Sequence, residues 1–162
     1  MTATALVTGA TGTIGAALVP ALLRAGWTVR VLTRRRDALD PSWAAQVQVV
    51  QGDASDAEVR RRALAGVEVV YYLLHSMAAA GDFAARDRDL AQGFAASARE
   101  AGTRRIVYLS GLHPVGPLSA HLASRVEVGE ILLGSGVPTA VLQAGVVLGE
   151  GSASFEMLRH LT

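Results

Sequence analysis

The sequence predicts an α/β fold, a parallel doubly wound sheet with helices on both faces. Strand-like and helix-like segments alternate along the chain, which favours parallel strands joined by right-handed helical crossovers. A glycine-rich turn at residues 8–15 joins the first predicted strand to the first predicted helix. A continuous apolar run at residues 67–74 has the length and character of a strand buried on both faces, so we expect it at the centre of the sheet.

The first two strands and the helix between them follow from local patterns. Residues 4–8 form a short, apolar, β-prone segment, and residues 28–33 alternate between apolar and polar side chains. Between them, residues 12–25 carry apolar side chains at helical spacing. Gly26 follows at the position where a left-handed helix cap belongs.

The third strand, the second helix and the central strand come next. Residues 47–51 are predicted to form a short strand. Ser55 and Glu58 match a capping box, which predicts that a helix begins there and extends through Leu64. The apolar run at residues 67–74 is the fourth strand.

The second half repeats the alternation. Residues 83–98 have the apolar spacing of a long helix that ends at Gly102, and residues 105–110 form the next strand. Residues 122–133 form another helix, followed by a sixth strand at residues 138–142. We find no internal repeat or linker, so residues 1–162 are expected to form a single domain.

The composition excludes several classes of protein. Of the 162 residues, 51% are hydrophobic and 18% are charged, with a net charge of +1, which is typical of a globular domain and not of a polybasic nucleic-acid binder. The absence of cysteine excludes disulfides and thiolate chemistry, and the absence of lysine excludes a Schiff base. We expect a cytoplasmic protein with no signal peptide, membrane span or metal site.

The glycine-rich turn, Thr8-Gly9-Ala10-Thr11-Gly12-Thr13-Ile14-Gly15, suits a phosphate group. In such a turn one glycine allows the bend, another lets the backbone approach a pyrophosphate, and a third lets helix and strand pack closely. The helix that follows offers unpaired N–H groups and the positive end of its dipole. We therefore expect dinucleotide binding here, through Gly9, Thr11, Gly12, Thr13, Ile14 and Gly15. A purely structural tight turn is the alternative.

The residues after the second strand bear on the choice of cofactor. A carboxylate there would bind the ribose hydroxyl of NAD, but this chain has Thr33, Arg34 and Arg35. Guanidinium groups suit a 2′-phosphate, so we expect NADP(H), with NAD(H) possible. Arg34 is the expected phosphate ligand, and Arg35 can stack on adenine. A solvated basic corner is the alternative interpretation.

Two further strand ends carry candidate cofactor ligands. Asp53, followed by Ala54, can accept a hydrogen bond from the adenine amino group or, alternatively, can serve as a helix N-terminal charge. Leu74, His75 and Ser76 end the central strand. His75 can titrate near neutrality, although an imidazole that is satisfied by the backbone is an equal alternative.

The catalytic candidates lie further along the chain. Ser110 ends the fifth strand, and His121 and Arg125 are four residues apart on the next helix, hence on one face. His121 can act as an acid or base while Arg125 holds cofactor or substrate oxygens. An exposed pair on the helix surface is the alternative.

At these residues the sequence resembles the short-chain dehydrogenase/reductase superfamily, in the atypical branch that includes the NmrA-like NAD(P)-binding proteins. The resemblance covers the whole chain and is carried by four motifs: Thr8 to Gly15, Gly52-Asp53, Tyr71 to Met77 with Gly81 to Phe83, and Ala144-Gly145 through Ser152. It implies a Rossmann fold with strand order 3-2-1-4-5-6. It also implies that the loop beginning at Ala144 and Gly145 closes over the nicotinamide.

The chain departs from this family in two respects. Family dehydrogenases use Ser with Tyr-x-x-x-Lys, whereas this chain keeps Ser110 and has His121 and Arg125 at the spacing of the missing pair. Members of the branch usually continue past the sixth strand into a substrate-binding portion, whereas this chain ends at Thr162. The expectation is therefore a dinucleotide-binding domain that lacks this portion.

Three functions remain open at this stage. The first is an NADP(H)-dependent oxidoreductase acting on a carbonyl or alcohol. The second is a non-catalytic module that senses the NADP(H) redox state and passes it to a protein partner. The third is an isolated half-domain with weak affinity. A homodimer is possible under each of them, and the sequence identifies neither the substrate nor the partner.

Overall fold

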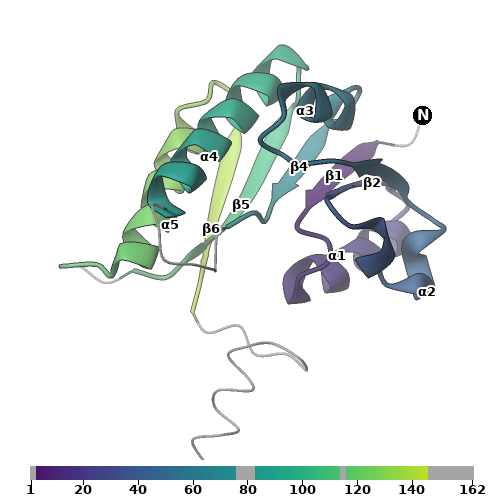
Figure 1. Cartoon of the computed structure of the whole chain (residues 1–162), viewed down its shortest axis with the longest axis horizontal. Helices are drawn as coiled ribbons and strands as arrows, with labels where there is room; N and C mark the ends of the chain where they lie inside the picture. The colour runs from purple at the N-terminus through teal and green to yellow at the C-terminus, as the bar shows by residue number, and fades with distance from the viewer. Residues whose placement is uncertain (1–2, 76–82, 114–115, 146–162) are drawn as a thin grey trace, which may run out of the picture.

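The computed structural model describes residues 3–75, 83–113 and 116–145 (Figure 1). The strands are β1 (Thr4–Thr8), β2 (Thr28–Thr33), β3 (Gln48–Gln51), β4 (Val69–Tyr72), β5 (Arg105–Gly111) and β6 (Thr139–Ala144). The α-helices are α1 (Thr13–Arg24), α2 (Pro41–Ala44), α3 (Ala57–Leu64), α4 (Phe83–Glu100) and α5 (Ala120–Leu133), and a 3₁₀ turn spans Arg36–Ala38.

The sheet confirms the predicted fold class and strand order. Its six strands run in the order β3-β2-β1-β4-β5-β6, and every neighbouring pair is parallel. Strands β1 and β4 are adjacent at the centre, as the apolar run at residues 67–74 indicated. The order reverses between them, and ligands of open α/β sheets bind at this switch point, outside the carboxyl ends of the strands.

Helices cover the two faces of the sheet in two groups (Figure 1). On one face, α3, α4 and α5 enclose a core that includes Leu64, Phe94 and Leu132, each fully buried. On the other face, Val19 of α1 and Trp43 of α2 pack against β1 and β2. These two apolar layers fix the strands, and therefore fix where the loops at their carboxyl ends lie.

Three local features differ from the sequence prediction. The capping box of Ser55 and Glu58 is wrong, because the Asp56 carboxylate accepts the hydrogen bonds from the Glu58 and Val59 amides and caps α3. Strand β4 is shorter than predicted, and its last predicted residues form the loop that reaches the site. The short helix α2 was not predicted, since four residues give no helical period; Asp40 caps it and a proline occupies its first turn.

We predict that the close packing at Gly15 makes the substitution Gly15→Ala destabilising. A methyl group there would lie 2.3 Å from the Gly9 carbonyl oxygen and 2.6 Å from the Ala10 Cα, and both belong to the backbone. Overpacking of this kind costs about 1–3 kcal/mol, which outweighs a gain in helix propensity of about 1 kcal/mol. Urea denaturation measures the free energy of unfolding.

Gly129→Ala is the matched control, because Gly129 is also a buried helical glycine. The nearest atom to its added methyl group is the Tyr108 Cε1 at 3.6 Å, an ordinary contact. This variant should unfold at the same or a higher urea concentration than the wild type. A Gly15→Ala variant as stable as Gly129→Ala would contradict the packing argument.

Candidate functional site

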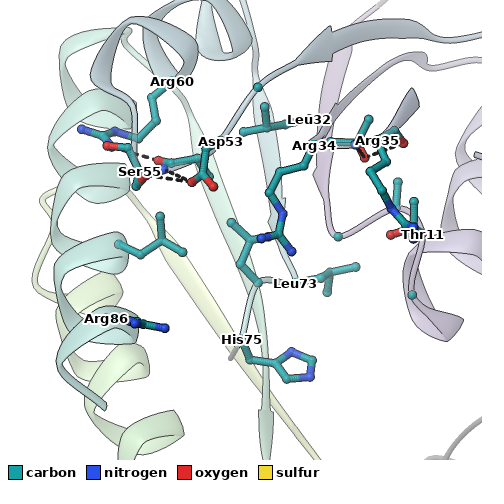
Figure 2. Close-up of a pocket in the computed structure, with 18 of the residues that line it drawn as sticks. Thr11, Leu32, Arg34, Arg35, Asp53, Ser55, Arg60, Leu73, His75 and Arg86 are labelled. Atoms are coloured by element: carbon teal, nitrogen blue, oxygen red, sulfur yellow. Dashed lines mark hydrogen bonds between the residues drawn. The ribbon is translucent and has the colours of Figure 1, made fainter. Parts of the chain in front are cut away.

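A cleft of about 1060 Å³ opens at the carboxyl ends of β1 to β4 (Figure 2). The glycine turn, the loops after β2, β3 and β4, and one face of α4 form its walls. It is lined by Gly9, Ala10, Thr11, Gly12, Leu32, Thr33, Arg34, Arg35, Gly52, Asp53, Ala54, Ser55, Arg60, Leu73, Leu74, His75, Arg86, Asp89 and Leu90. The volume is at the upper end for a small-molecule site and suits a ligand as long as a dinucleotide.

The glycine turn forms one wall of the cleft. Gly9 has a φ of 67°, which favours glycine, and its carbonyl accepts a hydrogen bond from the Gly12 amide at 3.0 Å. A side chain at Gly9 would meet the Leu73 carbonyl oxygen at 3.0 Å. Position 9 of the turn therefore fits against β4 and its following loop only as glycine.

The amino end of α1 supplies the anion-binding element. Gly12 is the N-cap residue, and no side chain caps the helix. The amides of Thr13, Ile14 and Gly15, in the first turn, lack acceptors within the helix because of helix geometry. Thr11 and Gly12 line the cleft, while Gly15 is buried against the turn. Unpaired N–H groups and the helix dipole fit the pyrophosphate of a dinucleotide.

The two arginines after β2 are exposed and project into the cleft. Figure 2 shows Arg34 extending towards the middle of the cleft and Arg35 lying beside Thr11. Their backbone is fixed from both sides. The Thr33 hydroxyl accepts from the Arg35 amide at 3.1 Å and donates to its carbonyl at 3.0 Å, and the Gln51 side-chain amide donates to the Arg34 carbonyl at 3.3 Å.

Asp53 lies at the start of the loop after β3 and shapes it. One carboxylate oxygen accepts from both the amide and the hydroxyl of Ser55, each at 2.8 Å. These hydrogen bonds hold the pKa of Asp53 below its ordinary value, and the Arg34 guanidinium lowers it further. An ionised carboxylate therefore faces the cleft beside the buried Ala54. The helix-capping role belongs to Asp56 instead.

The loop after β4 carries Leu74 and His75 to the cleft. Its start is held by the Thr8 hydroxyl, which donates to the Tyr71 carbonyl at 3.1 Å and accepts from the Leu73 amide at 2.9 Å. Desolvation of the imidazole and the nearby Arg125 guanidinium lower the pKa of His75. Ser76 lies outside the described residues.

The three catalytic candidates lie beside the cleft, and none of them lines it. Ser110 is 3% exposed, and its hydroxyl donates to the Arg125 carbonyl at 3.5 Å. The exposed His121 ring stacks on Phe83 at the start of α4, with ring centroids 4.3 Å apart. The structure thus joins Ser110 to the backbone of Arg125 and places the Arg125 charge near His75.

Ala144 ends β6 and Gly145 follows it, at the same edge of the sheet as the cleft. The Ala144 carbonyl accepts from the Leu112 amide at 2.8 Å, which extends the pairing of β5 and β6 to their ends. Neither residue lines the cleft. The loop that was predicted to close over the nicotinamide continues at residues 146–152, outside the described residues.

Sequence reasoning missed one wall of the cleft and one residue of α3. Arg86, Asp89 and Leu90 line it from α4, and Figure 2 shows Arg86 projecting from the helix. Their spacing of three and four residues places them on one helical face, which is the signal that could have grouped them. Arg60 also lines the cleft, but nothing in the sequence separates it from the adjacent Arg61 and Arg62.

Within residues 3–75, 83–113 and 116–145, no helix is both long and apolar enough to cross a membrane. The same part of the chain holds no group of three or more His, Cys, Asp or Glu side chains arranged to bind a metal ion.

Comparisons with known proteins agree with this geometry. The chain is 35% identical over 140 residues to a ceramide reductase of Caulobacter vibrioides, a match that covers 84% of this chain and 43% of the relative. The chain spans less than half of the length of the curated relatives it matches.

Solved structures share the fold. A short-chain dehydrogenase/reductase superfamily protein of Agrobacterium tumefaciens with bound NAD is 26% identical, with a TM-score of 0.72 over 86% of this chain and 48% of that one. The NADPH-dependent quinone oxidoreductase QOR2 of Escherichia coli, complexed with NADPH, is 27% identical, with a TM-score of 0.70 and coverage of 86% and 48%. The family model described as NAD(P)H-binding matches residues 9–131. The chain therefore belongs to this NAD(P)H-binding family, with a Rossmann-like fold of the short-chain dehydrogenase/reductase type.

Proposed function

We propose that the chain is the cofactor-binding part of an NADP(H)-dependent oxidoreductase that acts on a carbonyl or alcohol substrate. The observation that carries the proposal is the placement of Arg34 and Arg35 on the cleft formed by the glycine turn. No carboxylate follows β2 at the position where NAD-specific sites hold a ribose hydroxyl. Two guanidinium groups there favour a 2′-phosphate.

The cofactor roles follow from the positions of the lining residues. The amides of Thr11, Thr13 and Ile14 hold the pyrophosphate, and Arg34 binds the 2′-phosphate. Arg35 can stack on the adenine face. Asp53 accepts from the adenine amino group with the carboxylate oxygen that does not bind Ser55, and His75 flanks the entrance to the nicotinamide side.

The chemistry is assigned to Ser110, His121 and Arg125. When bound, a reduced nicotinamide would supply the hydride that the substrate carbon accepts. His121 holds a proton on its imidazole and donates it to the substrate oxygen, and Arg125 holds a cofactor or substrate oxygen through its guanidinium. Ser110 fixes the backbone of Arg125 through its hydroxyl. The reductase activity named for the Caulobacter relative supports a reaction of this class.

One prediction of this proposal concerns the choice between NADPH and NADH. The variant Arg34→Ala should bind NADPH at least about tenfold more weakly, because it loses charge-assisted hydrogen bonds to the 2′-phosphate worth about 1.5–3 kcal/mol each. Its affinity for NADH should change much less, since NADH lacks the 2′-phosphate. Fluorescence of the reduced nicotinamide during titration gives both dissociation constants. Tighter binding of NADH than of NADPH by the wild type would contradict the proposal.

Another prediction of this proposal concerns turnover of NADPH. The wild type should oxidise NADPH in the presence of at least one member of a panel of aldehydes, ketones and quinones. His121→Ala should lower that rate by about 100-fold or more, the usual contribution of a general acid. Absorbance of the reduced nicotinamide follows the reaction. His113→Ala is a control on another histidine, and wild-type turnover by His121→Ala would exclude His121 as the acid.

A further inference from the structure

Arg60 occupies an unusual position on α3. It is the first of three consecutive arginines, and it alone among them lines the cleft. Arg61 and Arg62 are exposed, and Arg61 forms a surface ion pair with Glu58 on the same helix. Arg60 is half-buried, and its guanidinium turns towards the loop after β3 (Figure 2). A partly buried guanidinium is costly unless it forms hydrogen bonds or ion pairs.

The partners of Arg60 belong to the cleft wall. Its Nη1 donates to the Ala54 carbonyl at 2.9 Å and to the Ser55 carbonyl at 2.7 Å. Its Nε donates to the Ser97 hydroxyl of α4 at 3.1 Å. One guanidinium therefore ties the loop after β3 to both helices that pack beside it.

Gly93 makes room for this arrangement. A Cβ atom at Gly93 would lie 3.0 Å from the Arg60 Cζ and Nη2 and 3.2 Å from Nη1. These three atoms belong to the planar guanidinium, and their distances from the Cβ position are nearly equal. The face of the guanidinium therefore lies over the position that a side chain at residue 93 would fill. Glycine is unfavourable in the interior of a helix, so the contact explains its presence in the middle of α4.

The same loop is fixed from its other end. Asp53 accepts two hydrogen bonds from Ser55, and Arg60 holds the carbonyls of Ala54 and Ser55. Charge-assisted hydrogen bonds to both carbonyls define which way these peptide groups face. The side of the loop that faces the cleft is thereby ordered before any ligand arrives, which lowers the entropic cost of binding.

We propose that Arg60 is a positioning residue for the adenosine half of the dinucleotide. It acts through the Ala54 and Ser55 carbonyls, and Gly93 is the space it requires. The ligand class is an adenine nucleotide bound against residues 53–55. The inference rests on the proposed dinucleotide binding, and it assigns a function to a residue that belongs neither to the glycine turn nor to the predicted catalytic set.

The test compares Arg60→Met with Arg62→Met. Both substitutions remove an arginine from the same helix, but only the first removes the hydrogen bonds to the loop. Three probes are titrated: NADPH, 2′,5′-ADP as the adenosine half, and reduced nicotinamide mononucleotide as the other half. Arg60→Met should weaken the binding of NADPH and of 2′,5′-ADP by a similar factor of about ten. It should leave the affinity for the mononucleotide unchanged, and Arg62→Met should change none of the three affinities.

Gly93→Ala provides a second route to the same contact. It keeps Arg60 but requires the guanidinium to move by a few tenths of an ångström, so it should weaken binding of 2′,5′-ADP by less than Arg60→Met does and leave binding of the mononucleotide unchanged. If both residues act through one contact, the double variant Arg60→Met/Gly93→Ala should bind 2′,5′-ADP no more weakly than Arg60→Met alone. Because Gly93→Ala keeps Arg60, it tests the contact even if Arg60→Met folds poorly.

Two results would overturn the inference. One is an unchanged affinity of Arg60→Met and Gly93→Ala for 2′,5′-ADP. The other is an equal loss for 2′,5′-ADP and the mononucleotide, which would mean that Arg60 only stabilises the domain as a whole. Because the readout is binding of separate halves, a lack of NADPH turnover contradicts the oxidoreductase proposal without changing the result for Arg60.

Discussion

The site depends on the backbone contact between the glycine turn and the first turn of α1. Gly15 lies so close to the Gly9 carbonyl that no Cβ atom fits between them, and Gly9 itself packs against the Leu73 carbonyl. The contact places the amino end of α1 directly against the carboxyl end of β1. It therefore aims unpaired amides and the helix dipole at the switch point of the sheet, where the cleft opens.

The remaining walls are held by three polar side chains, and two of them, Thr33 and Arg60, also line the cleft. Thr8 fixes the loop after β4, Thr33 fixes the loop after β2, and Arg60 fixes the loop after β3. Each side chain satisfies backbone groups that would otherwise be left without partners at a strand end, and such groups are costly to bury. The exposed arginines and the Asp53 carboxylate thus project from loops of defined shape.

Alternation of β and α segments predicted the fold class because it leaves few topologies open, and the family resemblance supplied the strand order. The sequence was less informative about which of several adjacent residues takes a given role. Asp56 caps α3 although Ser55 and Glu58 matched the motif, since Asp53 already bonds Ser55. Arg60 faces inward because α4 presents a glycine to it, a pairing of distant segments that no local pattern contains. In the candidate site, the positions of the predicted cofactor ligands at strand ends followed from topology, whereas the stacking of His121 on Phe83 depends on the approach of two helices.

The central claim is that the amides of the glycine turn hold a pyrophosphate, and amide chemical shifts test it directly. Titration with NADPH should produce its largest ¹H–¹⁵N shifts at residues 11–15, with smaller shifts in the loops after β2 and β3. The same changes at residues 11–15 should follow from ADP-ribose, which has the pyrophosphate but no nicotinamide. Binding of NADPH with no shift at these amides would contradict the account.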